Sequence, residues 1–449
     1  MIDLDSFSNR WEISAKLTLI TPMRIGGGQN AGAYSLSQAP VMLSYDAQTG
    51  TALPYIPGSS LKGVLRSTVE RIVRTFNEEK ACIGVGDKKT SKVLCGDCDV
   101  CSVFGSQKAG ASIRVQDAYL SSSMGNKGVL EERPHCATLY TLIDGSYKMQ
   151  VSTRRKGNRT FDVPRINLRM EEVIASNTSF DIKINLDNAD EKDVGMIVLA
   201  LNEFNHKRCH IGGGVSRGHG FAEVYGTRVK KKVIFSDPER FFRVDTESID
   251  PYHFCDVAKQ YLVKIDDGKE VERRDFDVYY KAYAGTGSEG TFVVEYNVET
   301  LTDFQMPGEE EITVTSQGVP VIPGSTIKGF LRHKLIADDV SADTIDEMFG
   351  SANGKNQHRG RIIVSDADPK SEFSGKDKIP AGTNLTLWMV FDNIKVEEFK
   401  LIDDILSEPQ VVTGNTSAGK KRGSRSFKNQ VIFSRKGAKR FDANEFLKQ

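Results

Sequence analysis

The pattern of apolar and polar positions predicts two β-strands in equivalent surroundings, one in each half of the chain. Residues 11–21 and 291–302 alternate between apolar and polar positions and are rich in β-branched side chains, which is typical of a strand with one buried face. A Pro-Gly pair follows each strand and begins a helical pattern. In the first copy the apolar stripe of this helix is formed by Leu61, Leu65, Val69 and Ile72.

A second helix and a last strand are predicted further along. The helices cover 191–204 in the first half and 396–406 in the second, and the strand covers 221–225 after a glycine-rich segment. Strand, helix, strands, helix, strand is the order of a ferredoxin-like or RRM-like α+β unit. We therefore expect an α+β protein with two such domains in tandem.

An internal repeat supports this duplication. The segment Ile-Pro-Gly-Ser-Ser-Leu-Lys-Gly-Val-Leu-Arg at 56–66 returns as Ile-Pro-Gly-Ser-Thr-Ile-Lys-Gly-Phe-Leu-Arg at 322–332. Val-Phe-Gly-Ser at 103–106 returns as Met-Phe-Gly-Ser, and Val-Gln-Asp-Ala at 115–118 returns as Val-Ser-Asp-Ala, in the same order along the chain. One structural unit has been used twice.

The length of 449 residues fits two domains, since one hydrophobic core rarely serves so long a chain. We place the first domain at 1–228 and a shortened second domain at 286–449, with a linker at 229–285, where the sequence is charged and poorly periodic. The first domain carries an insertion at about 78–102 and an arm at about 120–175, for which the second domain has no room.

Charge and hydropathy limit the classes of function. The 60 basic and 60 acidic residues cancel, which argues against a protein that coats nucleic acid indiscriminately, so a nucleic-acid surface must be local. No stretch approaches the roughly 20 apolar residues that span a bilayer, and the first residues lack an export signal. We expect a cytoplasmic protein.

Four of the seven cysteines lie close together in the insertion, and their spacing is the sharpest chemical signal in the chain. Cys82 precedes two overlapping C-x2-C pairs formed by Cys95, Cys98 and Cys101. Four thiolates suit a closed, tetrahedral structural zinc site, which leaves no open position for a substrate. Reduced cysteines without a metal and an iron–sulfur cluster are the alternatives.

The repeated Pro-Gly-Ser element begins a helix, where unpaired amides and the helix dipole favour an anion. We expect Ser59 or Ser60, and Ser325 or Thr326 in the second copy, to cap the amides. Basic residues four positions apart share a helix face and could bracket a phosphate. The candidate contacts are Gly58, Ser59, Ser60, Lys62, Arg66, Ser325, Lys328 and Arg332. A capped helix with two solvated bases is the alternative.

Three further basic or glycine-rich segments are candidates for contact with a polyanion. A glycine-rich loop lets a phosphate backbone approach the peptide amides, at Gly212, Gly213, Gly214, Ser216 and Arg217. The segment at 414–421 resembles a P-loop but has Lys421 in place of a hydroxyl residue, so it is interpreted as the basic counterpart of that loop, with Lys420, Lys421 and Arg422.

The sequence of the arm predicts a hairpin with a positively charged edge around a Gly-Asn turn. The basic residues of this edge are Arg154, Arg155, Lys156, Arg159 and Arg165. A flexible turn is the alternative for the glycine-rich loop, and solvated surface charge is the alternative for the arm.

The motifs at 54–63, 103–106, 115–118 and 212–220 resemble those of the RAMP superfamily, in particular the backbone subunits of type III CRISPR–Cas effector complexes. The resemblance implies RRM-like cores that hold a CRISPR RNA guide and a thumb-like hairpin that shapes the duplex of guide and target RNA. It also implies partnership with the other subunits of an effector complex. Cysteine-bound zinc resembles some type III members, and two fused units resemble type III-D.

One departure from the family bears on catalysis. Many members carry an aspartate in the loop after the first strand that supports metal-dependent cleavage of target RNA, but residues 26–41 contain no acid here, and Asp46 is explained as a turn residue. We therefore assign no catalytic residue and expect a binding and scaffolding subunit. The alternatives are an endoribonuclease subunit that cuts target RNA beside the thumb with Mg, and a metal-independent guide-processing ribonuclease that uses His210 or His219.

Overall fold

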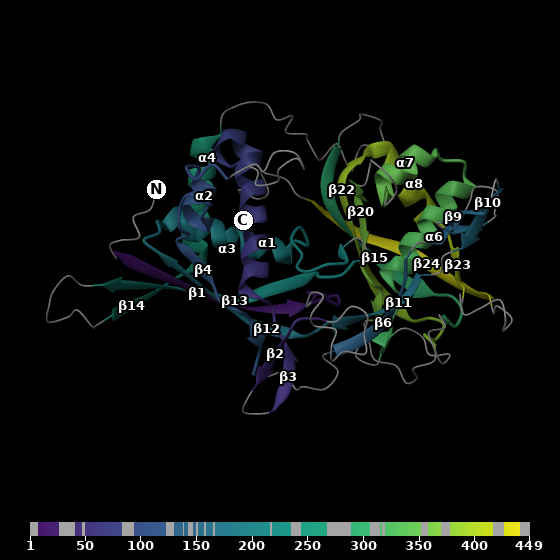
Figure 1. The fold of residues 1–449 in the computed structure, drawn as a ribbon, viewed down its shortest axis with the longest axis horizontal. Coiled ribbons are helices and arrows are strands. Elements are labelled where there is room, and N and C mark those ends of the chain that lie inside the picture. Colours follow the sequence, from purple (N-terminus) through teal and green to yellow (C-terminus); the bar gives the residue numbers. More distant parts are fainter. Residues whose placement is uncertain are drawn as a thin grey trace.

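The structure is a computed structural model, and two α+β units can be followed in it (Figure 1). It describes residues 8–26, 41–46, 50–82, 94–122, 130–137, 139–141, 147–149, 151–156, 159–164, 167–215, 218–234, 244–266, 289–305, 315–316, 319–351, 358–369, 378–415 and 426–440.

The first unit is built on an antiparallel sheet whose central strand is β1. In spatial order the strands are β14 (Val244–Ile249), β13 (Ala222–Ile234), β1 (Asn9–Leu19), β12 (Ser179–Asp187) and β4 (Ile113–Val115), and β5 (Tyr119–Leu120) also pairs with β12. The helices are α1 (Gly58–Phe76), η2 (Glu78–Lys80), α2 (Asp99–Phe104), α3 (Glu191–Asn205) and α4 (Pro251–Ile265). The order of β13, β1, β12 and β4 around α1 and α3 is the ferredoxin-like arrangement predicted from the sequence.

Alternation along β1 positions this sheet. Every second residue from Trp11 to Leu19 is buried, because these side chains pack under the apolar stripes of α1 and α3, whereas the residues between them are only partly covered. The helices therefore cover one face of the sheet (Figure 1). The positions of β1 that face away from them carry polar side chains.

The predicted linker at 229–285 begins too early. Residues 229–234 continue β13, and β14 pairs with them in register. Helix α4 packs on α3, where a side chain at Gly195 would meet the carbonyl oxygen of Phe254 at 2.2 Å. Phe254 also makes an edge-to-face contact with Trp11, with 5.3 Å between ring centroids. Residues 229–265 therefore complete the first unit, and their mixed charge belongs to exposed edges.

The second unit repeats the plan with fewer additions. Its sheet runs, in spatial order, through β20 (Ile362–Val364), β22 (Asn384–Lys395), β15 (Glu289–Thr300), β24 (Ser426–Arg440) and β23 (Gln410–Asn415), with β21 (Asp368–Pro369) also paired to β22. Its helices are α6 (Gly324–Ala337), α7 (Ala342–Phe349) and α8 (Val396–Leu406). Two short ribbons accompany them, formed by β16 (Thr315–Ser316) with β17 (Val319–Pro320) and by β18 (Gly350–Ser351) with β19 (His358–Arg359).

The two units pack against each other through a small apolar cluster. Phe221 of the first unit lies with Val293, Ile363 and Val390 of the second, which occupy the face of the second sheet opposite its helices. At Gly218 the contact is so close that a side-chain carbon would meet the carbonyl oxygen of Val364 at 2.0 Å. The second unit is therefore docked on the first by the outer face of its sheet.

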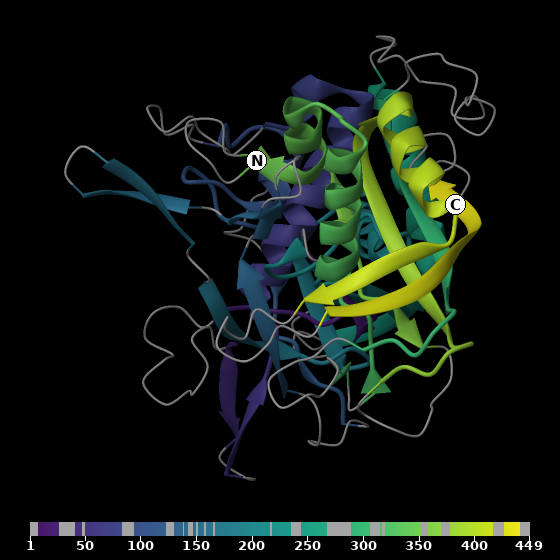
Figure 2. The same cartoon turned by 90° about the vertical axis from the view of Figure 1, so that its right-hand side faces the viewer.

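Several hairpins leave the first unit. They are formed by β2 (Leu43–Asp46) with β3 (Thr51–Pro54), β6 (Leu130–Ala137) with β11 (Asn167–Ile174), β7 (Leu139–Thr141) with β8 (Tyr147–Met149), and β9 (Val151–Lys156) with β10 (Arg159–Pro164). The β9–β10 hairpin stands away from the body of the molecule (Figure 2). The β6–β11 ribbon is anchored at the end of β11, where Ile174 and Met23 exchange backbone hydrogen bonds. Among the described helices, none is both long and apolar enough to cross a membrane.

Candidate metal centre and nucleic-acid interface

The structure brings together the four cysteines that the sequence singles out. The sulfur atoms of Cys82, Cys95, Cys98 and Cys101 all lie within 4.8 Å of one another. Cys82 is 3.4 Å from Cys101 and 3.8 Å from Cys98, and Cys95 is 3.9 Å from Cys101, measured between Sγ atoms. Zinc–sulfur bonds of about 2.3 Å in a tetrahedron place sulfurs about 3.8 Å apart, so the cluster has the dimensions of a four-thiolate metal site.

The local backbone prepares these thiols for a cation. Cys98 is the N-cap of α2 and its sulfur accepts a hydrogen bond from the Cys101 amide at 3.4 Å, while its own amide donates to the Cys95 sulfur at 3.3 Å. Burial alone would raise the pKa of the Cys95 thiol, but bonds from the amides of Asp97 and Cys98 lower it to about 6. Burial raises the pKa of Cys82 to about 12. Burial also raises the pKa of Cys98, so a cation among the sulfurs would favour the thiolate form of Cys82 and Cys98.

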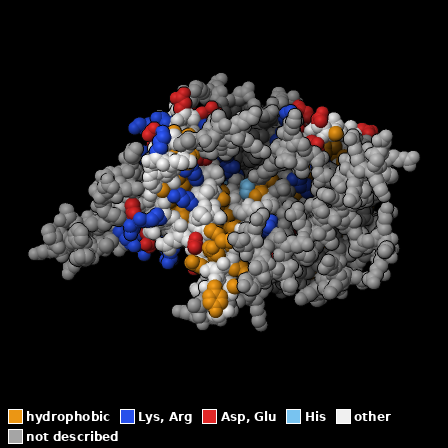
Figure 3. All heavy atoms as spheres, in the orientation of Figure 1, with side chains coloured by type: hydrophobic (Ala, Val, Ile, Leu, Met, Phe, Trp, Pro, Cys, Tyr) orange, Lys and Arg blue, Asp and Glu red, His pale blue; other side chains and the backbone are white. Residues whose placement is uncertain are grey.

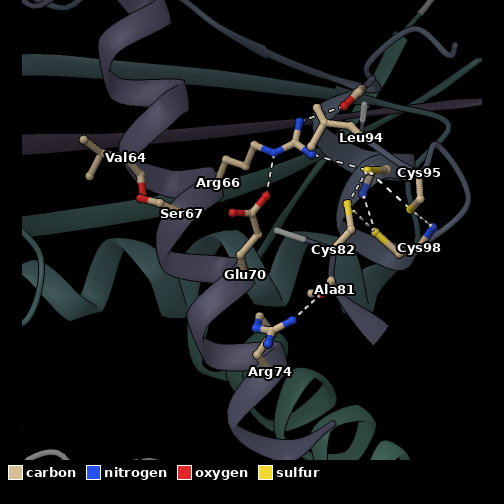
Figure 4. A network of polar contacts seen from close by, with 12 residues as sticks. Val64, Arg66, Ser67, Glu70, Arg74, Ala81, Cys82, Leu94, Cys95 and Cys98 are labelled. Carbon is tan, nitrogen blue, oxygen red and sulfur yellow. Dashed lines mark hydrogen bonds and ion pairs between the residues drawn. The ribbon is translucent and has the colours of Figure 1, made fainter. Parts of the chain in front are cut away.

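Arg66 connects this cluster to helix α1 (Figure 4). Its guanidinium donates from Nε to Glu70 at 2.8 Å, from Nη1 to the carbonyl oxygen of Gly105 at 2.7 Å, and from Nη2 to the Cys101 sulfur at 3.3 Å. Only 17% of the side chain is exposed. In the second unit, which has no cysteine cluster in its described residues, Arg332 donates to Asp346 at 2.7 Å. The two arginines therefore brace α1 and α6 against the segments that follow them, and contact with RNA stays a prediction for both.

The expected serine caps at the helix starts are wrong. Helices α1 and α6 begin after Pro57 and Pro323, and in neither case does a side chain of the capping residue accept a hydrogen bond. A distant carboxylate takes that place: the Gly58 amide donates to Asp117 at 2.7 Å. In the second unit the Gly324 amide donates to Asp366 at 2.8 Å.

Both glycines are required by a close backbone approach. A side-chain carbon at Gly58 would meet the carbonyl oxygen of Val115 at 2.2 Å, and one at Gly324 would meet that of Val364 at 2.3 Å. The repeated Pro-Gly-Ser and Val-x-Asp-Ala motifs thus form one clasp between a helix start and the next strand. Both aspartates belong to the repeat, so the sequence indicated that they are needed. It did not indicate that their partners are the first amides of the two helices.

The basic residues on these helices lean toward the neighbouring strand. Lys62 donates to the carbonyl oxygen of Ile113 at 3.4 Å, and Lys328 donates to that of Ile362 at 2.8 Å. Burial, and then the charge of Arg66, lower the pKa of Lys62. Ser59 and Ser325 are exposed in the first turn of their helices, and Ser60 is half-buried. Phosphate contacts by these residues stay predictions.

The first part of the glycine-rich loop is exposed to solvent, and its last part packs against the second unit. Gly212 and Gly213 are exposed, and the Gly213 amide donates to the carbonyl oxygen of Arg24 at 2.7 Å. Gly214 is half-buried, and Gly218 lies against the second unit with a φ of +83°. Two predicted contacts, Ser216 and Arg217, lie outside the described residues, as do their counterparts Lys420, Lys421 and Arg422.

The predicted arm hairpin is confirmed. Strands β9 and β10 pair in register, with Lys156 opposite Arg159, Arg155 opposite Thr160 and Arg154 opposite Phe161. Four basic residues therefore sit on one projecting two-stranded ribbon (Figure 2). Arg165 lies outside the described residues, as does most of the loop in which the family's catalytic aspartate is absent here. Asp46 ends β2 opposite Thr51, beside the turn to which the sequence assigns it.

Comparisons with known proteins agree with this architecture. A family model described as the RAMP superfamily matches residues 16–223 and 297–448, which is well over half of the chain and falls once on each unit. The chain is also similar to three proteins named "CRISPR system Cms endoribonuclease Csm3". That of Methanothermobacter thermautotrophicus is 23% identical over 234 residues, covering 51% of this chain and 89% of that protein.

The two other relatives are similar over comparable lengths. The protein of Enterococcus italicus is 26% identical over 212 residues, covering 46% of this chain and 86% of its own length. The protein of Methanocaldococcus jannaschii is 28% identical over 216 residues, covering 45% of this chain and 74% of its own length. Each relative therefore corresponds to about half of this chain, the length of one unit.

Proposed function

This chain belongs to the RAMP superfamily with two copies of the family's domain, and from that premise we propose that it is a CRISPR RNA-binding backbone subunit of a type III interference complex. The observation that carries the proposal is the match of three proteins named "CRISPR system Cms endoribonuclease Csm3" to about half of this chain, in a molecule whose two units share one plan. Its partners are the guide RNA, the target RNA and neighbouring subunits of the complex.

The arm supplies the most direct route to a duplex. Arg154, Arg155, Lys156 and Arg159 lie on a ribbon that projects from the sheet, so they reach a partner that the body of the unit does not touch. Cations on such a ribbon contact phosphates, which sets position and affinity without reading bases. In this proposal the arm lies against the guide–target duplex and displaces a base, while the exposed glycines at 212–213 approach the guide backbone.

We propose zinc as the metal of the cysteine cluster. Four sulfur ligands with no carboxylate or histidine among them, at tetrahedral spacing, favour zinc, and a closed set of four makes the role structural. The metal would join the insertion to α2, and Arg66 would offset part of the negative charge that four thiolates leave around a divalent ion. Elemental analysis should give about one zinc per chain, and Cys95→Ser with Cys98→Ser should remove it.

Cleavage of target RNA is the second candidate function, because the relatives are named endoribonucleases. Here no acid occupies residues 26–41, so the contribution of this chain would be geometric: the arm places a 2′-hydroxyl in line with the next phosphate, and a magnesium ion would be held by other groups. Guide processing by His219 is less favoured, since this side chain is only 5% exposed, whereas the half-buried His210 keeps that alternative open.

Reconstitution of the complex with guide RNA and labelled target tests the proposal. The variant Arg154→Ser/Arg155→Ser/Arg159→Ser should weaken target binding and abolish any cut opposite this subunit, while the guide is largely retained. Lys80→Ser/Lys264→Ser/Lys400→Ser removes the same charge from exposed sites elsewhere and should behave as the parent. Equal target binding by both variants would contradict the role of the arm, and cleavage in EDTA would contradict the need for a metal.

A further inference from the structure

The outer face of the first unit's sheet, opposite α1 and α3, is built differently from the same face of the second. In the second unit this face carries Val293, Ile363 and Val390 and is covered by the first unit. In the first unit the corresponding positions of β1 carry Arg10, Glu12, Ser14, Lys16 and Thr18. An apolar sheet face is stabilised by burial against a neighbouring unit. A charged face is costly to bury without ionic partners, so it stays exposed to solvent or binds a charged partner.

Cations gather across this face in cross-strand rows. Ser14 lies between Lys183 on β12 and Arg228 on β13, and Lys16 lies between Asp181 and Tyr225 on the same two strands. The neighbouring row adds Lys230 opposite Glu12. Basic side chains are visible where β13 and β14 meet solvent (Figure 3).

These cations differ from those at the end of the sheet. Asp187 accepts from both Arg10 and Arg114, and Glu12 pairs with Lys232 at 2.8 Å. Within the part of the chain that the structure describes, no carboxylate lies within ion-pair distance of Lys16, Lys183, Arg228 or Lys230. Glu12 also attracts Lys183 and Lys230 electrostatically, but Lys232 alone holds its carboxylate at ion-pair distance. The four cations therefore remain available to a partner outside the unit.

Two tyrosines flank the cations. Tyr119 on β5 is 54% exposed and stacks on Tyr55 with 5.9 Å between centroids and 21° between planes, which leaves its other side open. Tyr225 on β13 is 50% exposed, and its hydroxyl lies 3.1 Å from that of Thr18. Tyr119 is opposite Asp181, so the two rings stand at the two edges of one row with Lys16 between them.

We propose that this face binds a single-stranded segment of RNA, with bases stacked on Tyr119 and Tyr225 and phosphates on Lys16, Lys183 and Arg228. Aromatic rings separated by cations on an open sheet are the combination by which sheets of this kind hold single strands, since each base offers a π-face and each linkage a negative charge. An acidic protein surface would also satisfy the lysines, but the alternation of exposed rings and cations along one row matches the alternation of bases and phosphates in a single strand. The proposal shares with the proposed function the premise that the partner is RNA, but it uses none of the arm residues.

Fluorescence anisotropy of the full chain with a labelled oligouridine tests it. Lys183→Ser/Arg228→Ser should lower the slope of log affinity against log salt by about 1.4, at about 0.7 for each lost phosphate contact on a single strand. Lys264→Ser/Lys400→Ser removes equal charge from exposed helix positions and should leave the slope unchanged. Equal slopes for the two variants would overturn the proposal.

The stacking part has its own controls. Tyr225→Leu should weaken binding about ten-fold, whereas Tyr225→Phe keeps the ring and should bind within about two-fold of the parent. Cross-linking with 4-thiouridine RNA should label peptides that contain Tyr119 or Tyr225 in the parent and in the triple arm variant alike. Labels confined to the arm, or loss of subunit association with unchanged RNA binding in Tyr225→Leu, would assign this face to a protein partner instead.

Discussion

Asp117 and Asp366 show how one residue can decide where an element starts. Each carboxylate holds the first amide of a helix that lies far from it in sequence, at 2.7 and 2.8 Å. The sequence placed both aspartates in a repeat, but a repeat reveals that a residue is needed without revealing its partner. A local cap on Ser59 was the simplest expectation, and Pro57 displaced it because the helix begins two residues earlier.

Asp117 and Asp366 should contribute differently to the free energy of unfolding. Gly58 and Gly324 are both buried, but Asp117 is exposed whereas Asp366 is 2% exposed. Water can therefore replace the lost carboxylate oxygen more readily in the first unit than in the second. We expect Asp117→Ala to lower the free energy of unfolding by about 1 kcal/mol and Asp366→Ala by about 2–3 kcal/mol. Asparagine keeps an acceptor oxygen, so both Asn variants should lose less in chemical denaturation. Equal losses for Asn and Ala would refute the clasp.

Asp193 makes stability depend on pH. It is 6% exposed in the first turn of α3, and burial raises the pKa of its carboxyl to about 6 from an ordinary 3.8, with Lys192 opposing the rise. The unfolded chain ionises this group at lower pH than the folded chain. Its contribution to stability is therefore complete below the ordinary value and is lost as pH rises through about 6.

Asp193→Asn should remove this dependence. The amide oxygen can still accept from the Asp190 amide, which lies 3.2 Å from the carboxylate. Relative to the parent, the variant should gain on the order of 1–3 kcal/mol between about pH 4 and about pH 7, measured by urea unfolding. If the difference in unfolding free energy between parent and variant is the same at about pH 4 and about pH 7, the carboxyl of Asp193 does not have a raised pKa.

At the scale of elements, periodicity predicted most of the regular structure. The helix at 396–406 is found as predicted, and α3 extends only one residue beyond its predicted end. The strand predicted at 221–225 continues to Ile234, between β1 and β14. The sequence did not predict this extension, because the basic run at 228–232 interrupts the apolar alternation. Helix α4 was missed for a related reason: its buried residues are few, Phe254, Cys255, Ala258 and Leu262, within a charged sequence.

The insertion shows what spacing can and cannot predict. The spacing of the cysteines predicted a metal site, and the four sulfurs lie within 4.8 Å of one another, as a tetrahedral site requires. The role of Arg66 could not be read in the same way, because lysine and arginine one turn apart on a helix fit phosphate binding as well as bracing. Only the distances from its guanidinium to Glu70, Gly105 and Cys101 distinguish the two.

A pair of variants separates bracing from RNA contact. Arg66→Gln should lower the thermal midpoint and weaken zinc retention against a chelator by about ten-fold, the effect usual for outer partners of a metal ligand. Arg332→Gln loses a partly exposed ion pair with Asp346 and should leave metal content unchanged. If Arg66→Gln keeps zinc as well as the parent does and loses only RNA affinity, the phosphate role is the correct one.

At the scale of the whole molecule, the repeat predicted two units but not how they meet. The docking surface joins Phe221, which follows the glycine-rich loop, to the outer side of a sheet in the other half. Lys207 adds a contact over the ring of Trp388, 5.4 Å from its centroid. A strand with apolar residues on both faces is expected to be covered on both sides. Val293 and Val294 are adjacent, point to opposite faces and are both buried, so this pair was the feature of the sequence that indicated the contact.

Gly218 offers a test of this docking with an internal control. Gly218→Ala places a carbon 2.0 Å from the Val364 carbonyl oxygen at a φ of +83°, whereas Gly226→Ala has a φ of +65° and nothing within 4 Å. Both changes strain the backbone, so their difference reports the interface. Gly218→Ala should cost about 1–3 kcal/mol more and enlarge the radius of gyration in solution scattering. Equal costs and equal radii would show that the units do not rest on this contact.

The covalent connection between the docked units fixes their order and their ratio in any assembly that contains this chain. Separate subunits exchange, compete and vary in number, but two units on one chain arrive together in a fixed order and an equal count. Tethering raises the effective concentration of one unit near the other to about the millimolar range, so a contact as small as the Phe221 cluster suffices to keep them joined. In the proposed complex, each copy of this chain would therefore contribute two family domains at once and in a fixed order.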